Sequence, residues 1–180
     1  LPIDPRLARM VIEAERLDCV REVLIIVSAL AIQDVRERPD DRREKADELH
    51  KRFDVPGSDL LSLVKLWDHL RERQRALSGN QFRRMCREEF IHFLRLREWM
   101  DLHSQLRRAA GLTVRNNAEA QPDHVHRALL TGLLSHVGMR DGQRRDYVGA
   151  RQARFVIAPG TPLAKRLPDW VMAAELVETN

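Results

Sequence analysis

The side chains that could do chemistry in this chain do not form a recognisable catalytic set. Asp47-Glu48-Leu49-His50 has the composition of an acidic metal-binding tetrapeptide. Such a motif belongs at the end of a buried hydrophobic strand, whereas here the flanking pattern is that of a charged amphipathic helix. We interpret the tetrapeptide as a coincidence of sequence.

Other nucleophile and ligand patterns are also incomplete. A phosphate-binding loop needs a lysine after its last glycine, and none of the eight glycines is followed by one. His124 and His126 lack a cysteine or carboxylate cluster at zinc spacing. Ser135 and His136 are adjacent, which is the wrong geometry for a nucleophile and its base. We therefore predict no catalytic residue, no metal site and no cofactor in this chain itself.

Composition indicates a globular protein of 180 residues, with 43% hydrophobic and 32% charged residues. The longest apolar run, Val23 to Ile32, is much shorter than the roughly 20 residues that span a bilayer, so we expect no membrane segment and a cytoplasmic protein. Cys19 and Cys86 lie far apart on apolar helical patterns, which favours reduced core thiols over a disulfide. Because the chain begins at Leu1 rather than Met, we expect it to be part of a longer protein.

The basic residues are almost all arginine. The formal charge is +4, and only four of the 31 basic residues are lysine. Arginine suits contacts with phosphate groups and base planes. A GC-rich genome, which favours arginine codons, would explain the bias equally well, so charge alone does not identify a partner.

Apolar residues recur at helical spacing over most of the chain. Residues 19–30 are apolar almost all round, which predicts a helix in the interior. The segment 81–110 contains no proline or glycine, so we predict one long helix capped by Asn80. The other predicted helices begin after the cap Asp4, pass through Ala46, run from the cap Ser58 to about Leu77, and extend from His126 to Val137.

The pattern changes after Gly142. Aromatic and β-branched residues on both sides of Pro159-Gly160-Thr161-Pro162 predict two strands joined by a proline-rich turn. We therefore expect a mainly α fold that ends in an antiparallel β segment.

A basic strip lies between the apolar positions of the predicted long helix. It could follow a phosphate backbone. Because glutamates are interleaved with these residues, a solvated helix face is the alternative. The strip consists of Arg83, Arg84, Arg87, Arg95 and Arg97.

Two segments of the N-terminal half resemble DEAH-box helicases. Residues 1–10 are similar to the LP-x-DPRL stretch that closes the winged-helix domain of that family. Residues 19–30 resemble the helix that opens its helicase-associated, or ratchet, domain. Further matches fall at Ala46-Asp47, Phe90-Ile91, Leu96-Arg97, Asp101 and Gln105-Leu106, whereas His103 stands where the family usually carries arginine.

The C-terminal tail resembles the OB-fold of the same family. Residues 157–163, 168–171 and 175–179 are similar to its I-H-P-S-S-x-L, P-E-W-V and E-L-V-x-T signatures. Glycine and threonine in place of the two serines, together with residues 126–142, look most like the bacterial HrpA-type branch.

The resemblance implies a domain order. Residues 1–18 would end a winged-helix domain, 19–140 would form a helical ratchet-like helicase-associated domain, and 141–180 would supply the first strands of an OB-fold. Because an OB-fold normally has five strands, we expect the tail to leave a strand edge unpaired.

The resemblance also implies a function. In such helicases RecA-like domains hydrolyse ATP with Mg²⁺, while the accessory domains close a tunnel over single-stranded RNA. This chain would form part of the tunnel beside the RecA-like domains of its parent chain. Alternatively, it would dock protein partners or regulate the motor without touching RNA. The candidate RNA-binding residues are Arg87, Arg95, Arg97, Arg151, Arg154, Lys165 and Arg166.

Overall fold

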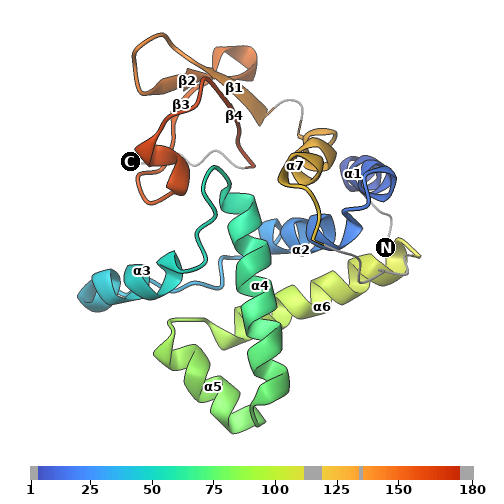
Figure 1. Ribbon diagram of the computed structural model, residues 1–180, viewed down its shortest axis with the longest axis vertical. Helices are drawn as coiled ribbons and strands as arrows, with labels where there is room; N and C mark the ends of the chain where they lie inside the picture. The colour runs from blue at the N-terminus through green and yellow to red at the C-terminus, as the bar shows by residue number, and fades with distance from the viewer. Residues whose placement is uncertain (1–3, 112–118, 134–135, 175–180) are drawn as a thin grey trace.

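A computed structural model describes residues 4–111, 119–133 and 136–174 of the chain. Figure 1 shows a set of helices with a small sheet at one end, and α4 running from beside the sheet to α5 at the opposite end. The helices are α1 (Pro5–Arg16), α2 (Val20–Leu30), α3 (Arg43–Lys51), α4 (Asp59–Ala76), α5 (Gly79–Glu88), α6 (Phe93–Ala109) and α7 (Pro122–Leu130). Short 3-10 turns are η1 (Asp40–Arg42), η3 (Ala150–Gln152) and η4 (Pro162–Lys165).

Local capping explains where several helices begin. The Asp4 side chain accepts a hydrogen bond from the backbone N–H of Arg6 at 2.8 Å, and Ser58 Oγ accepts one from Leu61 N–H at 3.1 Å. Both predicted caps are confirmed. The predicted Asn80 cap is wrong, because Ser78 caps α5 in a reciprocal capping box with Gln81.

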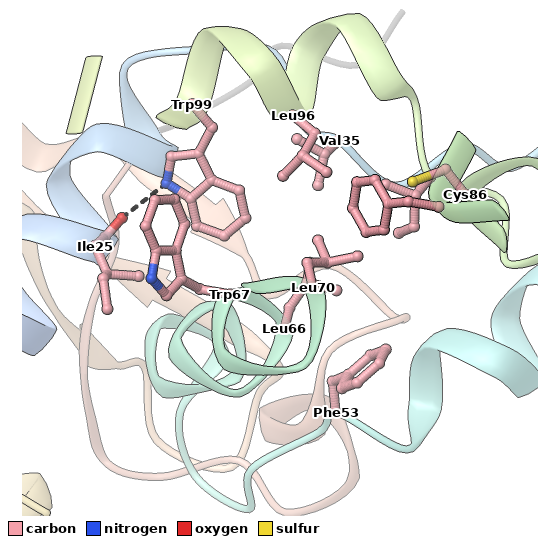
Figure 2. Packing of buried hydrophobic residues seen from close by; sticks show 11 residues of the cluster. Ile25, Val35, Phe53, Leu66, Trp67, Leu70, Cys86, Leu96 and Trp99 are labelled. Carbon is pink, nitrogen blue, oxygen red and sulfur yellow. Dashed lines mark hydrogen bonds between the residues drawn. The ribbon is translucent and has the colours of Figure 1, made fainter. Parts of the chain in front are cut away.

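Helix α2 occupies the centre of the helical region, as its all-round apolar pattern predicted. Val23, Leu24 and Ile25 are at most 1% exposed, and α2 contacts α1, α4, α6 and α7. Figure 2 shows the indole of Trp99 from α6 directed at the backbone of this helix. Its N–H lies 3.1 Å from Ile25 O and 3.0 Å from Ser28 Oγ, so the one polar edge of a buried ring is satisfied.

The buried residues form two clusters that meet at α2 and α4. One gathers Trp67, Leu70 and Trp99 with Cys86, and the other joins α1, α2 and α7 around Cys19. Both cysteines are free and buried, and burial raises the pKa of each thiol to about 11. The prediction that they are core thiols is confirmed.

The predicted single helix over 81–110 is wrong. Helix α5 ends at Glu88, α6 begins at Phe93, and Phe90 between them has a φ of 56°, in the left-handed region. The break is held from outside, because the loop after α2 forms a β-bridge to it. Glu37 N–H donates to Phe90 O at 2.8 Å and His92 N–H donates to Val35 O at 2.7 Å. These tertiary hydrogen bonds replace those that a continuous helix would have made.

The sheet contains more strands than predicted. Four antiparallel strands lie in the order β3-β2-β1-β4, namely β1 (Val137–Arg140), β2 (Asp146–Val148), β3 (Arg154–Val156) and β4 (Trp170–Met172). The predicted helix from His126 to Val137 is therefore wrong, since α7 ends at Leu130 and Val137 begins the central strand β1.

Two strands of this sheet have an open edge. Over the described residues β3 pairs only with β2, and β4 pairs only with β1. The predicted unpaired edge stays a prediction, because residues 175–180 are not among those that the structure describes. The tail signature at 175–179 and Ser135 lie outside the described residues. In the part of the chain that the structure describes, no helix has the length and apolarity needed to cross a membrane.

The hydrogen bonds of the Trp99 indole predict a loss of stability when this side chain is replaced. Trp99→Phe keeps an aromatic side chain but removes the indole N–H and leaves part of the buried volume unfilled, so the free energy of unfolding should fall by about 2–4 kcal/mol in urea denaturation. Trp170→Phe is the matched control, because Trp170 is 63% exposed and its substitution should change stability by less than about 0.5 kcal/mol. Equal effects of the two substitutions would contradict this role for Trp99.

The close packing within the sheet predicts a second effect. A Cβ added at Gly138 would lie 2.8 Å from Cε1 of Phe155, so Gly138→Ala must displace that ring. We expect a loss of about 1–3 kcal/mol in thermal or urea unfolding followed by circular dichroism. Gly160→Ala, which would meet nothing within 4 Å, should leave stability nearly unchanged.

Candidate nucleic-acid interface

The three predicted RNA-binding arginines of the helical region are not on one continuous helix. Arg87 lies in the last turn of α5, and Arg95 and Arg97 lie in the first turns of α6, on the other side of the break. Arg95 Nη1 donates to Asp34 O at 3.1 Å. Arg87 and Arg97 are exposed and make no ion pair or side-chain hydrogen bond with a described residue, so their guanidinium groups are available to a ligand.

The four predicted residues of the β segment differ in their surroundings. Arg154 on β3 forms ion pairs with Asp141 at 2.9 Å and with Asp146 at 3.7 Å. Arg151 in η3 has a φ of 56° and an exposed side chain. Lys165 and Arg166 are exposed at the end of η4. Arg151, Lys165 and Arg166 thus have free charges as far as the described residues extend.

A groove of about 1970 Å³ separates the sheet from the helices. Of the predicted residues, only Arg154 and Arg166 line it. Among the other lining residues are Arg36, Asp59 and Trp170, which were not predicted as site residues. In sequence Asp59 is indistinguishable from an ordinary acidic residue in the first turn of a helix, and Trp170 from a core tryptophan.

Carboxylates determine much of the charge in this groove. Arg36 forms an ion pair with Asp34 at 2.8 Å. Burial raises the pKa of Asp34, but the hydrogen bonds from Arg36 outweigh it and leave the pKa below its ordinary value. Asp59 receives no such hydrogen bond, and burial leaves its pKa above the ordinary value although the charge of Arg36 opposes the shift. Asp59 is therefore an acceptor without a donor among the described residues.

His103, at the position where the resemblance expects arginine, lies in an aromatic and cationic cluster. Its ring is 4.6 Å from the Trp67 ring, and the guanidinium of Arg71 lies 5.7 Å from the Trp67 centroid. Burial, together with the charges of Arg107, Arg71 and Arg21, lowers the pKa of His103 to about 4. His103 is therefore neutral at neutral pH and does not supply the positive charge of an arginine.

The residues considered for metal or catalytic chemistry have structural contacts. Asp47 and His50 lie in α3, where Asp47 Oδ2 accepts from Arg38 at 2.7 Å and His50 Nε2 lies 2.9 Å from Glu89 O. His126 Nε2 lies 2.6 Å from Ser58 Oγ, which connects α7 to the start of α4. Among residues 4–111, 119–133 and 136–174, no three potential ligands group into a metal site.

Comparison with known proteins identifies both parts of the fold. The family model described as helicase-associated domain (HA2), ratchet-like, matches residues 4–92. The model described as an oligonucleotide/oligosaccharide-binding (OB) fold matches residues 125–180. The ATP-dependent RNA helicase HrpA of Escherichia coli is 55% identical over 183 residues, and a homologue from Haemophilus influenzae is 49% identical over 186. These alignments cover 100% of this chain and 14% of each relative.

The fold and these matches define a ratchet-like helicase-associated domain followed by an OB-fold segment. The chain belongs to the HrpA-type family of DEAH-box RNA helicases and corresponds to part of their accessory region. The chain spans about one seventh of the length of the two bacterial relatives, 14% of each.

The neutral state of His103 predicts a dependence of stability on pH. In the unfolded chain His103 binds a proton below its ordinary pKa of 6.5, whereas in the folded chain it does so only near pH 4. The free energy of unfolding therefore falls as the pH decreases between these two values. His103→Asn removes this contribution. Urea denaturation at pH 7 and pH 5 should show that the variant loses about 1 kcal/mol less than the wild type over this interval. Equal losses would contradict the assignment.

Proposed function

We propose that this chain is an RNA-contacting accessory segment of an ATP-dependent DEAH-box helicase, and that it forms part of a path for single-stranded RNA beside the RecA-like domains of a longer protein. ATP and Mg²⁺ would bind to those motor domains. We also propose that the protein is cytoplasmic. In the same proposal its domains divide between residues 18 and 19 and between residues 140 and 141. The relatives that match the whole chain are RNA helicases, which supports this function.

The observation that carries the proposal is a set of exposed cations without acidic partners. Most other arginines of the helical region have structural roles, such as the Arg16–Glu13 and Arg84–Glu88 ion pairs. In contrast, five of the seven candidates make neither an ion pair nor a side-chain hydrogen bond within the described ranges, so a phosphate could bind without first displacing another partner. These five are Arg87, Arg97, Arg151, Lys165 and Arg166.

Salt dependence tests this proposal. Fluorescence anisotropy of the chain with a labelled single-stranded oligouridylate should give an affinity that falls linearly with salt on logarithmic axes. Arg97→Ala should reduce the slope by about 0.7, the value for one phosphate contact on a single strand.

Arg16→Ala on α1 is the matched control, because Arg16 is exposed and pairs with Glu13 at 2.5 Å. It should leave the slope unchanged. Salt-insensitive binding, or equal slopes for the two variants, would contradict RNA contact by Arg97. A duplex of the same length should bind more weakly than the single strand.

The groove favours a second candidate function, the docking of protein. Its lining contains four aspartates, Asp34, Asp59, Asp146 and Asp169, against three arginines. Apart from the exposed Arg166, such a surface attracts phosphate less than a basic one does. We therefore keep docking within the longer protein as the alternative for this face of the molecule.

A further inference from the structure

In the part of the chain that the structure describes, four arginines hold their guanidinium groups over aromatic rings. The fourth in chain order, Arg83 of α5, lies 5.2 Å from the centroid of the Phe93 ring and makes no ion pair or side-chain hydrogen bond with a described residue. Its exposed guanidinium group is therefore positioned by a ring but is not occupied by a polar partner. The other three do have polar partners, which are Asp41 for Arg42, Glu89 for Arg52 and Gln74 for Arg71.

The break between α5 and α6 creates the contact between Arg83 and Phe93. These residues are ten positions apart, which corresponds to about 15 Å along the axis of a continuous helix. Because the chain turns at Phe90, α6 begins beside α5, and the Phe93 ring packs 6.3 Å from the Phe82 ring. The contact is thus a product of tertiary structure, which is why Arg83 was predicted as part of a basic strip but not as an RNA-binding residue.

Two further exposed side chains lie next to Phe93 on α6. Leu94 follows it and is 62% exposed, and Arg97 lies one turn further along the helix, where residues three and four apart are neighbours on the surface. Arg97 makes no ion pair with a described residue. The surface therefore combines an apolar side chain, a positioned guanidinium plane and a second available cation. We call Arg83, Phe93, Leu94 and Arg97 the α5–α6 surface.

This combination of side chains suits an unpaired nucleobase. Unpaired bases of RNA stack on aromatic rings and on guanidinium planes. One face of the Arg83 guanidinium lies over Phe93, and the exposure of Arg83 leaves the other face accessible, so a base could extend the stack that the ring begins. Contact with Phe93 also restricts the Arg83 side chain before binding, which reduces the entropy lost when a ligand binds.

We propose that the α5–α6 surface binds one unpaired base of single-stranded RNA, which stacks on Arg83 and contacts Leu94, while Arg97 binds an adjacent phosphate. This inference rests on the proposed RNA-contacting function and adds a base contact to the phosphate contacts on which that function depends. Because every base has a stacking face, the site accepts any sequence. None of its four residues lines the groove between the sheet and the helices.

Substitution of Arg83 by lysine separates a base contact from a phosphate contact. Lysine keeps the charge but has no planar group, so Arg83→Lys should weaken binding of a labelled oligouridylate roughly three- to tenfold in fluorescence anisotropy at constant salt. An abasic strand of the same length keeps the phosphates but has no bases, and Arg83→Lys should bind it as tightly as the wild type does. The slope of affinity against salt should not change, because lysine retains the cation.

Arg84→Lys is the matched control, because Arg84 is the next residue of α5, is exposed and pairs with Glu88 at 2.9 Å. It should bind both strands as the wild type does. Leu94→Ser, at an exposed position, should weaken binding of the oligouridylate but not of the abasic strand, without altering the circular dichroism spectrum. Arg97→Lys should change neither affinity by more than about twofold, because lysine also binds a phosphate as a point charge.

Equal losses of affinity for the two strands on Arg83→Lys would overturn the base site and assign Arg83 to a phosphate instead. Unchanged affinity for both strands would place Arg83 outside the RNA contact. If the wild type shows no salt-dependent binding of the oligouridylate, the proposed function fails together with the base site. If Arg97→Ala reduces the salt slope while Arg83→Lys does not discriminate between the strands, only the base site fails, so the two failures are distinguishable.

Discussion

The burial of α2 among four other helices is the constraint on which the rest of the structure depends. A helix without a polar face needs neighbours all round, and α1, α4, α6 and α7 supply them. The Trp99 indole orients α6 on α2, because its N–H donates to Ile25 O and Ser28 Oγ. Ser28 in turn donates to Leu24 O at 2.7 Å, which satisfies a hydroxyl within an otherwise apolar helix.

The break between α5 and α6 is the feature that sequence patterns could not reveal. Caps at Asp4 and Ser58 are local, so they were predictable from a few adjacent residues. The break at Phe90 is not local. Between residues 81 and 110 no glycine or proline interrupts the apolar spacing, and the distant loop at 35–37 hydrogen-bonds to the turn between the two helices. The spacing within each half was therefore predicted correctly, whereas their separation was not.

The sheet also contains a strand that local sequence patterns did not predict. Tyr147, Phe155 and Val171 carry β-forming side chains, and the prediction of strands around them was correct. Strand β1 was not predicted, and its first residue, Val137, was assigned to the end of a helix, because residues 137–140 have little intrinsic preference for either structure. It is extended because β2 and β4 pair with it on either side, and Gly138 leaves the space that the Phe155 ring occupies.

The candidate sites demonstrate why arginine content alone does not locate a binding surface. Sequence identified the cations but not their partners, and the partners decide their availability: Arg154 is occupied by Asp141, while Arg97 is free of ion pairs with the described residues. The same reasoning applies to acids. Asp34 is neutralised by Arg36, whereas Asp59 keeps a buried oxygen without a donor. Arg97 lies outside the groove, whereas Asp59 and Arg166 both line it, so the charges without partners among the described residues are divided between two parts of the surface.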